Sequence, residues 1–251
     1  MIIKEFRILM PLEMDEYYRG QLFAVSETSK NETGGGDGVL VLENDGFTST
    51  TVRPGHSITG IYTHKIYRTK SKSPWALRKI FPDAAFVLHE ECWNAFPYCK
   101  TVIKALDLSP ALLKKREVII IDIYDDSLLK KSDITPETDV REFESKKTGR
   151  GRLPKDWIET TKPVMCCYKV VQVHFKMFGF QTMVEHVLQR QYPRIFAKFN
   201  RELYCWTDRW YDMTIEDIKK MEREATEQLK KQIAEPEKRG TVCDVDDKGT
   251  T

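Results

Sequence analysis

The sequence predicts an α+β fold in which an antiparallel sheet carries long helices on one face. Two observations indicate it: strand-like segments come first with short helical patterns between them, and two long helical patterns come last. Because no Pro-, Ser- or Gly-rich linker divides the chain, we expect one domain over residues 1–234, followed by a mobile charged tail over 235–251.

The first elements follow from residue periodicity and from turn residues. Residues 2–10 alternate as a strand does, and residues 12–29 repeat apolar side chains at the helical period until the glycine-rich stretch NETGGGDG ends the helix. A strand at 39–42 follows, closed by the turn residues Asn44-Asp45-Gly46. One side of the first helix is expected to carry Met14, Tyr18, Leu22 and Val25.

The middle of the chain predicts three more strands and two short helices. The stretch IYTHKIYR, residues 61–68, is rich in β-branched and aromatic residues. Ser73-Pro74 starts a helix, because proline suits the first helical position, and Ser109-Pro110 starts another in the same way. Strands are expected between these two helices, around 84–93 and 98–104.

The last strands lead into a helical region. Residues 118–121 form an apolar run that should be a strand covered on both faces. A further strand is expected over 164–176, and the remainder should be helical. The final helix starts at Thr214, with Asp217 three residues on as a partial capping box.

Composition places the chain among soluble globular proteins. It has 251 residues, 41% hydrophobic and 31% charged, with a formal net charge of +2, so no nucleic-acid partner is expected. It contains no apolar run of about 18 residues that would cross a membrane, and its N-terminus lacks the apolar core of a signal peptide. We therefore expect a cytoplasmic protein whose six cysteines are thiols.

The strand at 61–68 carries polar residues in an unexpected place. Side chains in a strand alternate between two faces, so Thr63 and Lys65 share a face with Ile61 and Tyr67. A solvent-facing sheet would explain this arrangement, and so would a polar group enclosed beside the strand.

The last helix raises the same question at Glu222. The helical spacing of its apolar residues leaves one slot in the stripe, and Glu222 occupies it. A buried carboxylate costs several kcal/mol unless it is paired or hydrogen-bonded. The alternative is that the helix rotates slightly, so that Met221 packs inward and Glu222 lies at the rim.

Other polar residues lie on apolar sides of predicted elements. Gln21 lies on the apolar side of the first helix, Asn94 alternates with apolar residues of its strand, and Cys99 and Thr101 share a face with Ile103. Buried polar groups are nearly always hydrogen-bonded. A single such residue has ordinary explanations, but several together indicate an interior that holds something partly polar.

Enzyme and metal signatures are missing from the sequence. The five histidines form no HExxH pattern, no GxSxG elbow occurs, and neither KTGRGR nor NETGGGDG matches a phosphate-binding loop. We expect no catalytic residues, no metal site and no cofactor. The apolar segment HFKMFGFQ, residues 174–181, either caps the core or forms an exposed tip that contacts a partner or a membrane.

Five stretches identify a family. IYTHKIY, NETGGGDG, WNAFPYCKT, SKKTGRG and CWTDRWYDMTIEDIKKMERE occur in the order found in phosphatidylinositol transfer proteins, and the chain resembles their small single-domain class from its first strand to its last helix. The resemblance implies a START-like fold, in which a curved antiparallel sheet and long helices enclose one phospholipid. It also implies exchange of phosphatidylinositol and phosphatidylcholine between membranes by a monomer that touches membrane surfaces transiently.

The resemblance assigns roles to the residues singled out above. It implies that the lipid headgroup is bound by Thr63, Lys65, Asn94 and Glu222. Inositol hydroxyls donate and accept hydrogen bonds and the phosphate is anionic, and these side chains suit such groups. The other positions implied are Gln21, Cys99 and Thr101 in the cavity lining, Met177 and Phe178 at a membrane-docking tip, and Ser145 as a regulatory phosphorylation site.

Three departures from the family pattern stand out. Met177 and Phe178 replace paired tryptophans, which favour the membrane interface more strongly. Pro193 predicts a kink or break in a helix that is unbroken in the family. The chain is short between residues 101 and 118, where one family strand is expected to be missing. Two alternatives to transfer stay open: an adaptor that presents phosphatidylinositol to lipid kinases, and an enzyme acting on a small hydrophobic substrate in the same cavity.

Overall fold

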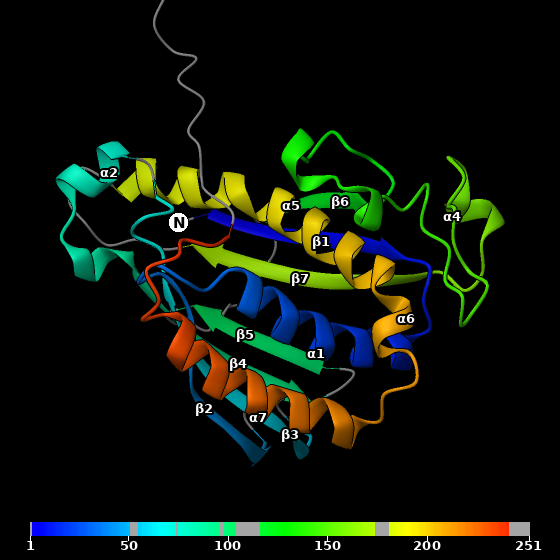
Figure 1. Ribbon diagram of the computed structural model, residues 1–251, viewed down its shortest axis with the longest axis horizontal. Helices are drawn as coiled ribbons and strands as arrows, with labels where there is room; N and C mark the ends of the chain where they lie inside the picture. Colours follow the sequence, from blue (N-terminus) through cyan, green and yellow to red (C-terminus); the bar gives the residue numbers. More distant parts are fainter. Residues whose placement is uncertain are drawn as a thin grey trace, which may run out of the picture. The chain divides into compact units, whose positions relative to one another are not determined.

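The computed structural model of the chain describes residues 2–50, 55–73, 75–95, 98–103, 116–173 and 181–240 (Figure 1). The chain divides into two compact units, each made of two stretches of sequence. Unit 1 comprises Met1–Val25 and Asp107–Lys219, and unit 2 comprises Ser26–Leu106 and Lys220–Thr251. The predicted α+β class is confirmed, because both strands and long helices are present.

Unit 1 contains a three-stranded sheet in the order β6-β1-β7. Its strands are β1 (Ile2–Met10), β6 (Glu117–Asp122) and β7 (Met165–Val173). β1 and β7 pair antiparallel, as expected, but β1 and β6 run parallel. A parallel pair requires a long crossover connection, and the chain between Met10 and Glu117 supplies one.

The long helix α5 (Gln181–Cys205) packs on one face of this sheet. Phe6 of β1 contacts Phe196 edge to face, with ring centroids 5.0 Å apart. The opposite face is exposed at β6, where Val118 is 43% and Ile120 is 65% exposed. The expectation that strand 118–121 is covered on both faces is therefore wrong. The expectation fails because α5 covers only one side of the sheet.

Pro193 does not break α5, which is a single helix from Gln181 to Cys205. The break is therefore not observed, and a kink at Pro193 stays a prediction. The rings of Tyr192 and Phe196 flank Pro193, and both contact Phe6.

The helix α1 (Met14–Asn31) begins in unit 1 and buries a side different from the one expected. Tyr17 and Ala24 are buried, whereas Met14 is 50% exposed. Gly20 explains the rotation, because a Cβ atom built there would lie 2.9 Å from the ring of Trp210. The glycine thus lets the helix approach Trp210 closely along the side that periodicity did not select.

The remaining elements of unit 1 are short. They are the 3-10 turns η2 (Lys131–Asp133) and η3 (Pro136–Thr138) and the helices α4 (Trp157–Thr160) and α6 (Thr207–Trp210). Asp133 of η2 is tied to α5 by two hydrogen bonds from Arg194, of 2.7 and 2.8 Å. This ion pair fixes the segment after β6 to the helix that covers the sheet.

Unit 2 contains a four-stranded antiparallel sheet in the order β2-β3-β4-β5. Its strands are β2 (Gly38–Ser49), β3 (Ile58–Arg68), β4 (Val87–Ala95) and β5 (Tyr98–Ile103). β2 continues through Asn44–Gly46, so the turn expected there is wrong. Pairing with β3 extends the strand, and an irregularity in register between Val41 and Glu43 takes the place of the turn.

Helices and turns complete unit 2. They are α2 (Trp75–Ile80), the 3-10 turn η1 (Asp83–Phe86) and most of α7 (Ile215–Gln232), which crosses one face of the sheet in Figure 1. The capping box that starts α7 is confirmed, since the Asp217 amide donates to Thr214 Oγ1 at 3.1 Å and the Thr214 amide donates to Asp217 Oδ2 at 2.9 Å. The strand expected to be missing between 101 and 118, and the helix at Ser109-Pro110, lie outside the described residues.

Candidate functional site

The strand β3 holds Thr63 and Lys65 in the interior of its sheet, between β2 and β4. Thr63 pairs with Asn44 on β2 and with Cys92 on β4. The Thr63 hydroxyl donates to Asn44 Oδ1 at 3.0 Å. Lys65 pairs with Glu90 of β4. Both residues are partly accessible and so could reach a ligand lying on this face of the sheet.

The register of the sheet brings the other predicted strand positions to the same face. Residues directly opposite each other share a face, and β4 pairs Cys92 with Thr101 and Asn94 with Cys99. Since Cys92 is opposite Thr63, positions 94, 99 and 101 lie on the face of Thr63 and Lys65. The side chains of Asn94, Cys99 and Thr101 are outside the described part of the structure.

The face with Thr63 and Lys65 offers both charge signs and several hydroxyls. Glu90 lies beside Lys65 and accepts a hydrogen bond from the Tyr67 hydroxyl at 3.1 Å. An ammonium group, a carboxylate and hydroxyls together can bind a ligand that carries hydroxyls and an anionic group.

The opposite face of β3 has a different chemistry. The Tyr62 hydroxyl donates to Glu91 Oε1 at 2.9 Å, and burial together with this hydrogen bond raises the pKa of Tyr62 to about 12. His64 Nε2 lies 3.1 Å from His89 Nδ1. Tyr62 and His64 thus contact side chains on the face opposite to Thr63 and Lys65. Substitutions at Tyr62 or His64 can therefore serve as controls for substitutions at Thr63 and Lys65.

Glu222 lies on α7, in the same unit as this sheet. The apolar stripe of the helix is buried at Ile218, Ala225 and Leu229, as its spacing predicts. Glu222 and Met221 are both half-buried. Glu222 is therefore neither fully buried in the apolar stripe nor fully displaced from it by Met221. Gln21, on α1 in unit 1, is also half-buried, and Met177 and Phe178 lie outside the described residues.

Ser145 lies in a closed loop of unit 1 and is 1% exposed. Its hydroxyl donates to Asp208 Oδ1 at 2.5 Å, and the amides of Lys146 and Lys147 donate to the same carboxylate at 2.8 and 3.1 Å. Partial burial opposes ionisation of Asp208, but these three hydrogen bonds outweigh it and lower the pKa of that carboxyl. Sequence reasoning missed Asp208, because no spacing rule connects it to a loop about 60 residues earlier.

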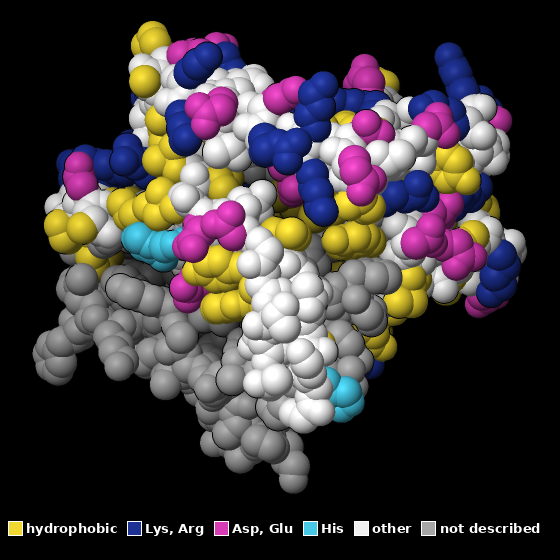
Figure 2. Space-filling model, turned by 90° about the horizontal axis from the view of Figure 1, so that it is seen from below, with side chains coloured by type: hydrophobic (Ala, Val, Ile, Leu, Met, Phe, Trp, Pro, Cys, Tyr) yellow, Lys and Arg dark blue, Asp and Glu magenta, His cyan; other side chains and the backbone are white. Residues whose placement is uncertain are grey.

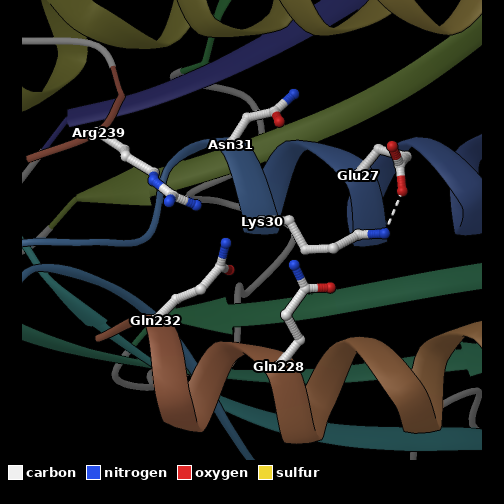
Figure 3. Close-up of a pocket in the computed structure, with 6 residues that line it drawn as sticks. All are labelled: Glu27, Lys30, Asn31, Gln228, Gln232 and Arg239. Carbon is white, nitrogen blue, oxygen red and sulfur yellow. Dashed lines mark ion pairs between the residues drawn. The ribbon is translucent and has the colours of Figure 1, made fainter. Parts of the chain in front are cut away.

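A pocket in unit 2 is lined by described residues that are not among the predicted site residues (Figure 3). It has a volume of ≈ 460 Å³ and lies between the C-terminal ends of α1 and α7. Its lining consists of Glu27, Lys30, Asn31, Gln228, Gln232 and Arg239. These residues are polar and belong to helix ends and to the stretch after α7, where amphipathic patterns give no signal for a site.

The described part of the face seen in Figure 2 carries charges of both signs. Lys and Arg side chains alternate with Asp and Glu over the face seen in Figure 2. Among the residues described, no group of three or more His, Cys, Asp or Glu side chains could hold a metal ion. Over the same ranges, no helix has both the length and the apolar character needed to cross a membrane.

Known proteins match almost the whole length of the chain. A family model described as phosphatidylinositol transfer protein matches residues 1–106 and 103–227. The phosphatidylinositol transfer protein beta isoform of Homo sapiens is 39% identical over 271 residues, which is 96% of each chain. Phosphatidylinositol transfer protein 1 of Dictyostelium discoideum is 39% identical over 263 residues, covering 94% of this chain and 97% of that one. The chain therefore belongs to the phosphatidylinositol transfer protein family.

Proposed function

We propose that this protein binds one phospholipid, phosphatidylinositol or phosphatidylcholine, in its interior and exchanges it between membranes without making or breaking a bond. The observation that carries this proposal is the shared sheet face of Thr63 and Lys65, in a chain whose relatives are named phosphatidylinositol transfer proteins. Residues 1–234 would act as one lipid-transfer domain, as a monomer in the cytoplasm.

The proposed headgroup site uses four side chains of unit 2. Lys65 supplies a positive charge for the phosphate, and the Thr63 hydroxyl both donates and accepts. Asn94 provides an amide donor and acceptor, and Glu222 accepts from inositol hydroxyls. Phosphatidylcholine lacks the ring of hydroxyls, so its transfer should depend less on these groups than transfer of phosphatidylinositol.

Burial of the acyl chains supplies the driving force for lipid uptake, at roughly 0.8 kcal/mol for each methylene group removed from water. Gln21, Cys99 and Thr101 are proposed to line the lipid cavity. The apolar pair Met177 and Phe178 would contact the membrane transiently while the cavity opens. Ser145 is proposed as a regulatory phosphorylation site. The Asp208 carboxylate beside its hydroxyl would repel a phosphate group, so modification would open the loop.

Two measurements test the proposed function. A native mass spectrum of the purified protein should show one phospholipid per chain. Incubation with donor and acceptor vesicles should move labelled phosphatidylinositol or phosphatidylcholine between them. Absence of transfer for both lipids would refute the proposal. Tight lipid retention without transfer would favour the adaptor that presents phosphatidylinositol to lipid kinases.

A further inference from the structure

The residues that line the pocket between the ends of α1 and α7 differ in how exposed they are (Figure 3). Asn31 and Gln228 are exposed. Lys30 and Glu27 are more enclosed, with side chains 21% and 16% exposed, and they form an ion pair. Gln232 is the most buried of the lining residues, at 5% exposure. The lining is therefore polar at its exposed residues and at its most buried one.

The side chain of Gln232 has a buried hydrogen-bond acceptor that is not paired. Its Oε1 atom is buried and has no partner among the described residues. A buried amide oxygen without a donor is destabilising, and most buried side-chain oxygens of native proteins are paired. Because Gln232 lines the pocket, a hydroxyl group of a bound molecule is well placed to donate to this oxygen.

Arg239 offers a hydrogen-bond donor for an anionic group on the same ligand. Two cations, Lys30 and Arg239, face one carboxylate, Glu27. Arg239 pairs with Glu235 and Glu237, which do not line the pocket, through Nε and Nη2. Figure 3 shows its guanidinium group directed into the space between the two helices. Nη1 of Arg239 has no hydrogen-bond partner among the described residues, so it can donate to an anionic group of a ligand.

The stretch that carries Arg239 is held in place by the glycine-rich loop after α1. The Gly35 amide donates to the Glu235 carbonyl at 2.9 Å, and the Gly36 amide donates to the Ile233 carbonyl at 3.0 Å. Gly35 has a φ of +64°, which glycine adopts without strain. These two backbone hydrogen bonds thus fix the stretch that carries Arg239 against the loop after α1, within the same unit.

We propose that this pocket is a second ligand site, which binds a polyol carrying one phosphate group. Amide side chains suit vicinal hydroxyls because each amide both donates and accepts, and the lining supplies three of them, at Asn31, Gln228 and Gln232. Of the proposed headgroup residues, the three whose side chains the structure describes, Thr63, Lys65 and Glu222, do not line the pocket. The ligand could be a soluble polyol phosphate or the headgroup of a lipid in a membrane. The site is independent of the transferred lipid.

Calorimetric titration of the full chain with myo-inositol 1-phosphate tests the site. The Gln232→Leu variant removes the buried amide at nearly constant shape, so it should weaken binding about tenfold. Its melting temperature should not fall, because the unpaired oxygen is gone. Lys231→Gln, an exposed neighbour outside the pocket, should bind like the parent protein. The double variant Thr63→Ala/Lys65→Ala should also keep its affinity, which separates this site from the headgroup site.

The source of the ligand is distinguished with flotation of vesicles made of phosphatidylcholine with or without phosphatidylinositol. Loss of vesicle binding in Gln232→Leu would identify a membrane headgroup, whereas loss of inositol phosphate binding alone would identify a soluble ligand. The proposal is overturned if the parent protein binds neither probe, or if Gln232→Leu binds both as the parent does. Vesicle-to-vesicle transfer by Gln232→Leu should equal that of the parent, so failure of the proposed function would be seen separately.

Discussion

The Ser145 hydroxyl donates a hydrogen bond of 2.5 Å to the Asp208 carboxylate. Ser145 also accepts a hydrogen bond at its Oγ from the Thr148 amide, at 3.0 Å. Since Asp208 bonds two further amides of the loop as well, one carboxylate fixes the conformation of the whole turn. The buried state of Ser145 therefore depends on Asp208, a residue on α6.

Replacing Asp208 should open this loop. Asp208→Asn removes the negative charge that strengthens three hydrogen bonds, so the free energy of unfolding should fall by roughly 1–3 kcal/mol. Urea denaturation measures this loss, and trypsin cleavage after Lys146 and Lys147 should become faster. Asp212→Asn is the control, because among the described residues Asp212 pairs only with the exposed end of Lys147. An Asp208→Asn protein with unchanged stability and cleavage would contradict the role of this carboxylate.

The same contacts predict how the stability of unit 1 depends on pH. The folded protein lowers the pKa of Asp208, and the Arg150 guanidinium outweighs burial to lower the pKa of Glu16. A carboxylate with a lowered pKa contributes stability above its unfolded pKa of about 4, and the contribution is lost as pH falls through the folded pKa. The stability difference between the parent protein and Asp208→Asn should be constant above pH ~5 and shrink below pH ~4. A difference that stays constant down to pH ~2 would contradict this account.

The glycine-rich loop should tolerate no side chain at Gly34. A Cβ atom there would lie 2.4 Å from the Glu237 carbonyl oxygen, so Gly34→Ala must displace the stretch after α7. We expect a loss of roughly 1–3 kcal/mol in the free energy of unfolding and faster hydrogen exchange at the Gly35 and Gly36 amides. Gly46→Ala is the matched control, since nothing lies within 4 Å of its added Cβ. Equal effects of the two substitutions would disprove the close contact.

The ion pair between Asp133 and Arg194 should contribute strongly to the stability of unit 1. The Asp133 side chain is 3% exposed, so Arg194→Met would leave a buried charge without its main partner. The expected loss is roughly 3–5 kcal/mol in the free energy of unfolding. Adding Asp133→Asn to this variant should recover part of the loss, because the buried charge is then removed. Arg190→Met, at an exposed position of the same helix, should change stability by less than about 0.5 kcal/mol.

Local pattern predicted most elements of the fold but not the contacts that decide which side they bury. The nine residues of β1 and the stripe of α7 follow directly from alternation and helical spacing. The buried side of α1 does not, because the close approach of Trp210 to Gly20 is a tertiary contact. In the same way, local pattern did not predict that α5 continues through Pro193, where Phe196 packs against Phe6 of a strand distant in sequence.

The candidate site was predictable to the extent that it follows the two-residue period of a strand. Alternation in β3 placed Thr63 and Lys65 together, and the sheet register adds position 94 to their face. The role of these residues came from resemblance to a family. The pocket at Gln232 and the hydrogen bonds of the Ser145 loop to Asp208 were not predictable, because both depend on segments that meet only in the folded chain.

The central claim is that Thr63 and Lys65 hold an inositol headgroup, and selective loss of transfer tests it most directly. Transfer of labelled phosphatidylinositol and phosphatidylcholine between vesicles should be compared for Thr63→Ala, Lys65→Ala and the control His64→Ala on the opposite face. We expect phosphatidylinositol transfer to fall roughly tenfold in the first two variants and phosphatidylcholine transfer to fall less, because phosphatidylcholine has the phosphate but no inositol hydroxyls. His64→Ala should behave as the parent protein. Equal losses for both lipids, or the same loss in His64→Ala, would contradict the account.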